Sequence, residues 1–343
     1  MTQSSEIAVP QAPAPAVEAP AADPGRYPDF FIVGHAKCGT TALYEMLRRH
    51  PQIFMPEDKE PQYFARGRPI VTPANAEAFS RTGWRERTLA GYLSLFAPAG
   101  DDQLVGEAST YYLCSAEAPR SIAEVRPDAR IIALLREPAS FLRSLHLQMV
   151  RYRLETERDL RRALALEPER REGRQIPREA FWPQALQYTA RVRYTEQLRR
   201  WHGVFGADNV LVLIYDDFRR DNVATARRVL RFLDVDDLVP MEPVAANPTA
   251  RVRSLRMDRA VRAVYQGRGP LGGSARAATM LLPGPVRAAG LRSVRRHLVF
   301  GKPEPPDADL MLRLRRRFHG EVVAISEYLG RDLVTEWGYD RLG

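Results

Sequence analysis

Two glycines enclose a short segment that could bind an anion. The segment GHAKCGTT (34–41) follows the apolar run FFIV and precedes ALYEMLRRH, whose apolar residues have a helical spacing. Glycine lets backbone N–H groups approach a ligand closely, and a helix start adds unsatisfied N–H groups and a positive dipole end. Thr40 and Thr41 add hydroxyl donors. The pattern predicts an anion-binding loop after a buried strand, although an ordinary strand-to-helix turn is the simpler alternative.

The position of the lysine in this loop argues against ATP. Loops that bind nucleoside triphosphates with Mg²⁺ have a lysine directly after the second glycine. Gly34 and Gly39 keep the spacing of such a loop, but Thr40 stands at the lysine position and Lys37 lies inside the loop. Only three of the 51 basic residues are lysine, which suggests that Lys37 is needed as a compact ammonium. The predicted ligand-binding residues of the loop are His35, Ala36, Lys37, Cys38, Gly39, Thr40 and Thr41.

Arg136 and Ser144 could bind one phosphate together. RIIALLREP (130–138) is a buried-strand pattern that ends at a proline, and a helical pattern containing Ser144 follows. A strand end and the next helical turns face the same crevice, so a fixed cation and a hydroxyl can share a phosphate there. The alternatives are an ion pair of Arg136 with Glu137 or Glu107, and an exposed serine without a ligand.

Three motifs in order resemble those of sulfotransferases that use 3′-phosphoadenosine 5′-phosphosulfate (PAPS). They are FFIVGHAKCGTTALYEMLRRHP, KEPQYF and RIIALLREPASFLRS, and the resemblance runs from about residue 28 to 235. The lysine–any–glycine–threonine order is that family's loop for the 5′-phosphosulfate, and KEPQYF resembles the second motif of its carbohydrate and bacterial branches. The resemblance implies that Arg136 and Ser144 bind the 3′-phosphate and that Arg251 and Arg253 could reach it.

Glu60, in KEPQYF, is the candidate general base. Sulfuryl transfer to a hydroxyl requires removal of the acceptor proton, which a positioned carboxylate can perform, and heparan sulfate-type enzymes resemble this chain in having a glutamate there. Charge on the leaving phosphate could be stabilised by Lys37, Thr40 and Thr41. Lys59 could contact the sulfonate or the acceptor. The alternative is a proline-bent surface loop in which both side chains are solvated.

Other residues of the resemblance are weaker candidates. Glu107, in GEAST, could support the site, and Tyr111 and Tyr112 are either acceptor-site walls or core aromatic residues. The disulfide-bounded basic loop of heparan sulfate enzymes is absent, which argues against carrying over their acceptor and their secretory setting.

Alternating strand and helix patterns predict an α/β fold, namely a P-loop-like three-layer fold with a central parallel sheet flanked by helices. Strands are expected at 29–34, at 130–138, where Pro138 stops the strand, and at 209–215. An amphipathic helix is expected over 186–206, and a final helix over 307–330.

The chain is expected to form one sulfotransferase domain over 27–343, after a disordered Pro/Ala-rich tail over 1–26. Residues 156–182 and 250–300 are patterned weakly and are expected to be acceptor-side excursions.

Composition excludes several classes of protein. No apolar run approaches the roughly 20 residues of a membrane span, and the N-terminus lacks a secretory signal pattern. Two cysteines, Cys38 and Cys114, form no disulfide framework, and no metal-ligand spacing is found, so a reducing, cytoplasmic location and no metal are expected. The net charge of +9 favours anionic ligands, but the arginines are scattered among acidic residues, which argues against nucleic acid.

These patterns together predict a cytoplasmic PAPS-dependent sulfotransferase. Its acceptor is expected to be a hydroxyl, or as second choice an amine, of a carbohydrate, a glycosylated compound or a lipid-like metabolite. A P-loop nucleotide-dependent kinase is the first alternative, and a non-catalytic basic nucleic-acid-binding protein is the second. The identity of the acceptor and the oligomeric state stay open.

Overall fold

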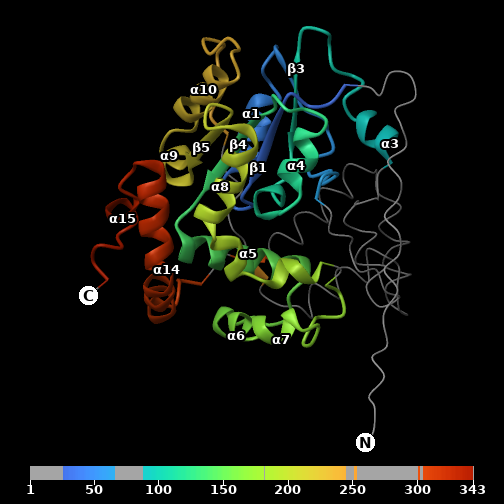
Figure 1. Cartoon of the computed structure of the whole chain (residues 1–343). Coiled ribbons are helices and arrows are strands. Elements are labelled where there is room, and N and C mark those ends of the chain that lie inside the picture. The colour runs from blue at the N-terminus through green and yellow to red at the C-terminus, as the bar shows by residue number, and fades with distance from the viewer. Residues whose placement is uncertain are drawn as a thin grey trace, which may run out of the picture.

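A five-stranded parallel sheet forms the centre of the molecule. The computed structural model describes residues 26–65, 88–180, 182–244, 251–252, 300–301 and 304–342. The strand order is β2-β3-β1-β4-β5, and every neighbouring pair is parallel (Figure 1). The strands are β1 (Phe30–Gly34), β2 (Ile53–Phe54), β3 (Leu104–Ala108), β4 (Arg130–Leu135) and β5 (Val210–Ile214). The predicted parallel sheet is therefore confirmed.

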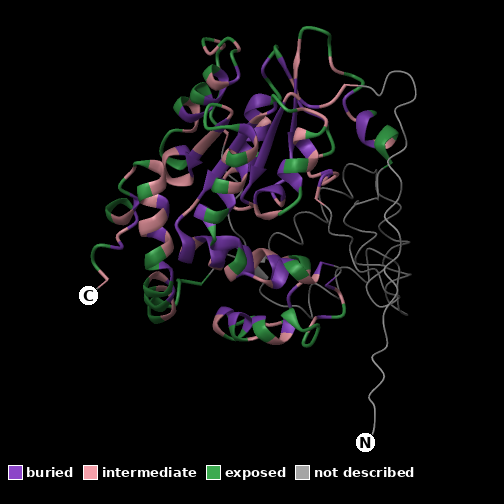
Figure 2. Cartoon of the chain, in the orientation of Figure 1, coloured by how far each residue is buried: buried purple, intermediate pink, exposed green. Residues whose placement is uncertain are grey.

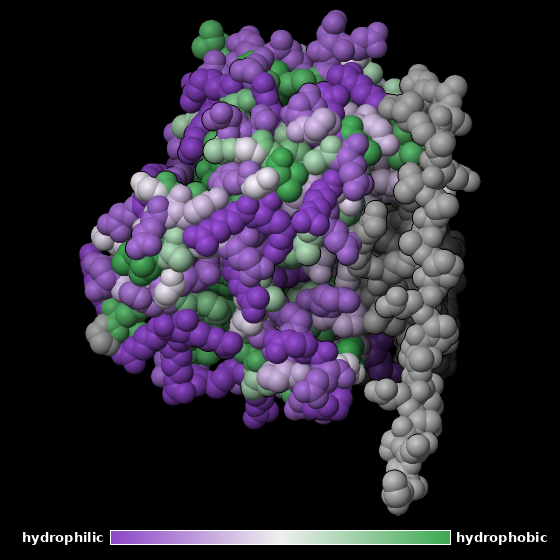
Figure 3. Space-filling model, viewed as in Figure 1, coloured by the Kyte–Doolittle hydropathy of each residue, from purple (hydrophilic) through white to green (hydrophobic). Residues whose placement is uncertain are grey.

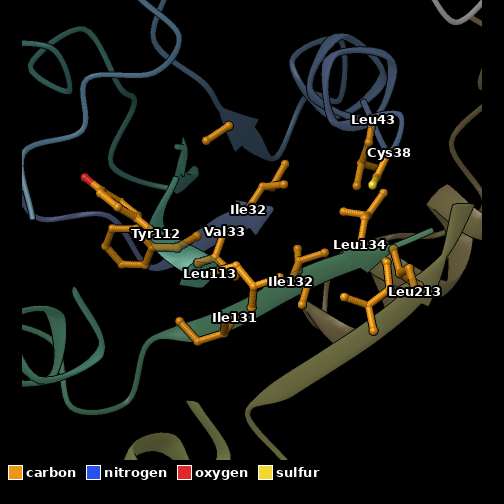
Figure 4. Close-up of a cluster of buried hydrophobic side chains, with 14 of the residues drawn as sticks. Ile32, Val33, Cys38, Leu43, Tyr112, Leu113, Ile131, Ile132, Leu134 and Leu213 are labelled. Atoms are coloured by element: carbon orange, nitrogen blue, oxygen red, sulfur yellow. The ribbon is translucent and has the colours of Figure 1, made fainter. Parts of the chain in front are cut away.

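The central strands are continuous apolar runs because both faces of the sheet are covered. Every residue of β1 is buried, and so is every residue of β4 after Arg130 (Figure 2). Side chains from both strands meet helices and loops in one core, as Figure 4 shows for Ile32, Ile132 and Leu134. This packing gives the site a rigid base.

Helices cover the sheet in separate groups. Their bounds are α1 (Thr40–Leu47), α3 (Leu89–Leu93), α4 (Ala118–Ala123), α5 (Pro138–Tyr152), α6 (Leu160–Ala165), α7 (Glu167–Arg171), α8 (Tyr194–Phe205), α9 (Tyr215–Arg220), α10 (Asn222–Phe232), α14 (Ala308–Leu329) and α15 (Leu333–Glu336), with 3-10 turns η1 (Tyr112–Cys114), η2 (Pro183–Leu186) and η3 (Thr189–Val192). Helix α1 packs with α10, α4 packs with α8, and α14 contacts both α5 and α8. The predicted final helix corresponds to α14.

The helix expected over 186–206 is wrong in its first third. Helix α8 begins only at Tyr194, after η2 and η3, because Arg193 has φ −80° and ψ 63° and breaks the helical path. The strand expected over 209–215 ends one residue early, because Tyr215 begins α9. In both places the spacing of apolar residues in the sequence continues past the point where the backbone changes direction. Periodicity alone therefore could not locate these ends.

Residues 156–182, which were expected to be a weakly patterned excursion, include two short helices. These are α6 and α7, which lie under α5 as an additional layer in Figure 1. Two short strands, β6 (Arg251–Val252) and β7 (Phe300–Gly301), pair antiparallel, and the backbone of β6 lies beside α5.

The surface in Figure 3 is largely hydrophilic, and its apolar side chains are scattered rather than gathered in one patch. Within the described ranges, every helix is too short or too polar to cross a bilayer.

Candidate active site

Three strand ends meet at the loop that follows β1. Strands β3 and β4 are the two neighbours of β1, and all three run in the same direction. The residues after β1, β3 and β4 therefore share one edge of the sheet. Strand β1 lies between β3 and β4, so the loop after β1 sits at the carboxyl ends of three adjacent parallel strands. Open α/β sheets bind their ligands at such a position.

The loop fits only glycine at both of its ends. Gly34 has φ 148° and Gly39 has φ 89°. A Cβ atom at Gly34 would lie 2.9 Å from the carbonyl oxygen of Thr110, and one at Gly39 would lie 2.7 Å from the Phe218 ring. Gly39 also caps α1 without any side-chain hydrogen bond, so the first N–H groups of α1 stay available for an anion. This supports the interpretation of the loop as an anion cradle over that of an incidental turn.

Two hydrogen bonds fix the loop after β1 to the end of β4 and the residue that follows it. The His35 N–H donates to the carbonyl oxygen of Leu134 (2.7 Å), and the Arg136 guanidinium donates to the carbonyl oxygen of Lys37 (2.9 Å). The Arg136 guanidinium also lies over the Tyr215 ring, 4.6 Å from its centroid. The expected alternative of an ion pair is wrong, since no carboxylate among the described residues pairs with Arg136. Arg136 thus presents an uncompensated positive charge beside the loop.

Positive charge gathers around Lys37. Burial lowers the pKa of Lys37, and the charges of Arg151 and Arg136 lower it further. Lys37 also has φ 66°, a left-handed conformation that is uncommon outside glycine. Lys37 and Arg136 are cations held close together, and cations in such proximity favour a multiply charged anionic ligand.

The side chains of His35 and Cys38 point into the core. His35 is fully buried, its Nε2 lies 2.9 Å from Gln197 Oε1, and burial together with the charge of Arg191 lowers its pKa to about 3. Burial raises the pKa of Cys38 to about 12, and Figure 4 shows its side chain between Leu43 and Leu134. Both residues can therefore contribute only backbone groups to the loop. Thr40 is buried and Thr41 is exposed.

Ser144 lies on α5, six residues after the helix begins, and is buried. The expected alternative of an exposed serine is therefore wrong. Arg251 lies in β6, whose backbone runs beside α5, and Arg253 lies outside the described residues. The binding of the 3′-phosphate by these residues stays a prediction.

Glu60 is fixed beside the loop rather than solvated. Its carboxylate accepts hydrogen bonds from the Thr110 N–H (2.8 Å) and the Thr110 hydroxyl (3.0 Å), and its own N–H donates to the carbonyl oxygen of Ala108 (3.0 Å). About 30% of the Glu60 side chain stays exposed. The alternative of a solvated surface loop is wrong for this residue. The carboxylate is held in place and can still reach a substrate.

Lys59 joins the two motifs. Its ammonium lies 3.2 Å from the Thr41 hydroxyl and 3.4 Å from Glu60 Oε1. A single cation therefore touches the first turn of α1 and the candidate base. This is the closest structural link between the anion loop and KEPQYF.

A buried carboxyl supports the segment that carries Glu60. Glu107 accepts hydrogen bonds from the hydroxyls of Tyr92 (2.7 Å) and Tyr112 (3.2 Å). The Tyr112 hydroxyl in turn accepts from the N–H of Phe64 (3.1 Å). Burial raises the pKa of Glu107 to about 7, against the lowering effect of the nearby hydroxyls. Tyr112 is accordingly a core residue, whereas Tyr111 stays partly exposed.

Sequence patterns did not identify several residues that build the site. Thr110 anchors Glu60, and Tyr215 and Phe218 pack against Arg136 and Gly39. These residues carry no motif of their own, and they reach the site from far along the chain. No grouping of three or more His, Cys, Asp or Glu side chains suited to a metal occurs in the described part of the chain.

Fold and site together define an α/β protein whose central strand ends in an anion loop, with a carboxylate held beside it. Residues 28–238 match the sulfotransferase family, and the chain belongs to that family. The resemblance seen in the three motifs is confirmed.

Several characterised proteins are similar to parts of the chain. Heparan sulfate glucosamine 3-O-sulfotransferase 6 of Homo sapiens is 35% identical over 122 residues, which are 35% of this chain and 30% of that protein. Carbohydrate sulfotransferase 15 of Mus musculus is 26% identical over 255 residues, which are 62% of this chain and 44% of that protein. The chain thus spans less than half the length of these relatives.

A solved structure is similar over most of the chain. The sulfotransferase from Alicyclobacillus acidocaldarius superposes with a TM-score of 0.61 at 25% identity, and the match covers 90% of this chain and 98% of that one.

Proposed function

We propose that this protein is a sulfotransferase that moves a sulfuryl group from PAPS to a hydroxyl of a carbohydrate acceptor, with Glu60 as the general base. The observation that carries the proposal is the contact of Lys59 with both Thr41 and Glu60, because it joins the anion loop to a fixed carboxylate. Family membership and the similarity to carbohydrate sulfotransferases support the same reaction. The cytoplasmic location is part of this proposal.

The residues around the loop fit the anionic part of PAPS. The glycine-bounded turn offers backbone N–H groups, Lys37 and Arg136 offer uncompensated charge, and Thr41 offers an exposed hydroxyl. PAPS supplies an activated sulfuryl group with a phosphate leaving group. Arg136, with Ser144 on α5, is proposed to bind the 3′-phosphate that distinguishes this nucleotide from ATP.

The chain's own groups would act at two points of the transfer. Glu60 takes the proton of the acceptor hydroxyl as its oxygen forms a bond to sulfur, and the bond from sulfur to the phosphate oxygen breaks. Lys37 and the N–H groups of the loop stabilise the charge left on that phosphate. The hydrogen bonds from the Thr110 N–H and hydroxyl keep the Glu60 carboxylate in one orientation during the proton transfer.

Calorimetric titration with adenosine 3′,5′-bisphosphate, with ATP as the comparison, tests the nucleotide. We expect micromolar or tighter binding of the bisphosphate, about −8 kcal/mol or better, and at least tenfold weaker binding of ATP. Equal binding of the two nucleotides would favour the alternative of a nucleotide-dependent kinase. Absence of bisphosphate binding would refute the proposal.

Glu60→Gln tests the base. We expect sulfuryl transfer to drop by roughly 100-fold or more, because the amide cannot take a proton, while bisphosphate affinity stays unchanged. Glu57→Gln is the matched control, since Glu57 is an exposed carboxylate three residues earlier. Turnover retained in Glu60→Gln would remove this residue from the mechanism.

Lys37→Arg tests why a lysine stands in an arginine-rich chain. The substitution keeps the charge and changes only its shape, so a loss of roughly tenfold or more in transfer rate is expected if a compact ammonium is needed. Normal transfer would show that the scarcity of lysine has no bearing on this site.

A further inference from the structure

The first residues of three helices lie beside Arg136. The Tyr194 hydroxyl, at the start of α8, donates to the carbonyl oxygen of Arg136 (2.9 Å). The Tyr215 ring, at the start of α9, has its centroid 4.6 Å from the guanidinium carbon of Arg136. Glu137, the next residue in the chain, caps the start of α5. The position of the guanidinium therefore depends on α5, α8 and α9 together.

One segment far along the chain is bonded to all three of these helix starts. It comprises residues 308–339, with α14 and α15 (red in Figure 1), and is called the α14–α15 segment below. On α9, Asp217 pairs with Arg331 (2.5 Å), and Asp216 accepts a hydrogen bond from the indole N–H of Trp337 (3.2 Å). The helix that places an aromatic ring on Arg136 is thus fixed at two adjacent carboxylates.

The same segment reaches the start of α8. Glu321, on α14, accepts a hydrogen bond from the N–H of Thr195 (2.7 Å), and Thr195 directly follows Tyr194. Helix α14 also packs against both α8 and α5. The residue whose hydroxyl holds the Arg136 carbonyl oxygen is therefore positioned from α14 as well.

The carboxylate of Glu137 is fully engaged. Its Oε1 atom accepts from the Ala139 N–H (3.0 Å) and from the Tyr339 hydroxyl (2.8 Å), and its Oε2 atom accepts from the Ser140 N–H (2.7 Å). The Nε atom of Arg315, on α14, lies 3.6 Å from Oε1. Glu137 is 6% exposed and Tyr339 is 1% exposed, so water cannot readily replace a donor that is lost.

The contact with Tyr339 keeps Glu137 away from Arg136. A carboxylate one residue from a cation can pair with it and so compete with an anionic ligand. Both residues lie in the described part of the chain, and they form no ion pair with each other, because the Arg136 guanidinium donates to the carbonyl oxygen of Lys37 instead. Burial and the charge of Glu137 raise the pKa of Tyr339, so its hydroxyl keeps the proton that it donates to the carboxylate.

We propose that the α14–α15 segment positions Arg136 for the 3′-phosphate of the nucleotide, with Tyr339 and Trp337 as the positioning residues. Tyr339 keeps the Glu137 carboxylate away from the guanidinium, and Trp337 holds the helix whose first ring supports it. The inference rests on the proposed function, because it assumes that Arg136 binds the 3′-phosphate. It assigns a part in nucleotide selection to a segment that lies outside the residues matched by the sulfotransferase family, 28–238.

Two nucleotides that differ only in the 3′-phosphate test this proposal. Adenosine 3′,5′-bisphosphate and adenosine 5′-phosphate would be titrated calorimetrically into the wild type and into Tyr339→Phe. We expect the variant to bind the bisphosphate at least about fivefold more weakly, through the loss of one hydrogen bond to a charged group, and to bind adenosine 5′-phosphate within about twofold of the wild type. A general loss of folded structure would weaken the binding of both nucleotides alike.

Two further variants make the result specific. Trp337→Phe keeps an aromatic ring but removes the N–H that bonds Asp216, so it should cause the same selective loss to a smaller extent. Tyr328→Phe is the matched control, because it removes a hydroxyl of α14 that contacts His202 Nδ1 (2.6 Å) rather than Glu137, and it should leave both affinities unchanged.

A double variant tests how Tyr339 acts. Glutamine cannot compensate a cation as a carboxylate does, so Tyr339→Phe should no longer weaken bisphosphate binding when Glu137→Gln is also present. An equal loss in both backgrounds would contradict a role of Tyr339 through the charge of Glu137.

The inference is overturned if Tyr339→Phe leaves the bisphosphate affinity unchanged, or if it weakens the binding of both nucleotides equally. Equal binding of the two nucleotides by the wild type would instead refute the assignment of Arg136 to the 3′-phosphate in the proposed function, and the inference with it. The two failures are distinguishable, because the first requires a wild-type preference for the bisphosphate and the second abolishes it.

Discussion

Two buried carboxyl groups, Glu107 and Glu155, are satisfied in opposite ways. Glu155 accepts from both ends of the Arg170 guanidinium (2.6 and 2.8 Å), from the Tyr188 hydroxyl (3.0 Å) and from two backbone N–H groups. Glu107 has no cation at all. It accepts from the two hydroxyls of Tyr92 and Tyr112, and its Oε1 atom is enclosed without a partner.

The difference sets the charge state of each group. Burial raises the pKa of Glu155, but the bonds and charge of Arg170 outweigh it, so the net pKa is lowered. Burial raises the pKa of Glu107 to about 7 because hydroxyls compensate a carboxylate less than a guanidinium does. Glu155 joins the chain after α5 to α7 through a charged pair with Arg170, whereas burial holds the pKa of Glu107, near the proposed base, at about 7. An ion pair therefore holds the layer of α6 and α7, whereas hydrogen bonds from tyrosine hydroxyls hold the segment that carries the proposed base.

The largest loss of stability is expected when Arg170 is removed from its ion pair with Glu155. Arg170→Met should destabilise the protein by about 3–5 kcal/mol, because it leaves Glu155 buried and uncompensated. Urea unfolding followed by circular dichroism measures this. Arg174→Met is the control, since Arg174 pairs with Glu172 at the exposed surface and should change stability little. A loss below about 1 kcal/mol in Arg170→Met would contradict the role assigned to the pair.

Glu107→Gln should change how stability depends on pH. The folded pKa of about 7 lies above the ordinary 4.5, so Glu107 favours folding most below pH 4.5 and loses that contribution as the pH rises through 7. The free energy of unfolding of the wild type, relative to Glu107→Gln, should therefore fall by roughly 1–3 kcal/mol between pH 4.5 and 7.5.

Thermal unfolding of both proteins across this pH range provides the measurement. His35 titrates in the opposite sense, because its depressed pKa of about 3 costs stability as the pH falls below 6.5. Taking the difference between wild type and variant cancels the His35 contribution. A difference that is independent of pH would show that Glu107 stays ionised throughout.

The smallest effects are expected from the two hydroxyls on Glu107. Tyr112→Phe and Tyr92→Phe should each cost about 1–2 kcal/mol, as expected for hydrogen bonds to a buried carboxyl. Only Tyr112→Phe also removes the acceptor of the Phe64 N–H, so it should slow sulfuryl transfer more than Tyr92→Phe does. Steady-state rates of sulfuryl transfer for the two variants provide the test. Equal rates would show that the hydrogen bond from Phe64 to Tyr112 does not help to position Glu60.

Local patterns were sufficient for the parts of the site that lie within one motif. The loop with Lys37, the strand end at Arg136 and the carboxylate Glu60 each follow from residue type and spacing, because a strand, a turn and a helix start are local structures. The structure corrects details that depend on distant contacts. The helix expected from residue 186 begins at Tyr194.

The sequence by itself determined the fold class, the family and the type of chemistry. It carries them in buried apolar runs, in glycines at forced backbone angles and in a lysine that precedes the second glycine. Only the tertiary structure decided which residues meet across the site, namely Thr110 with Glu60 and Lys59 with Thr41. These pairings depend on the order of strands in the sheet and on how the chain returns to it. Neither leaves a periodic signal in the residues themselves, and so these pairings could be found only in the structure.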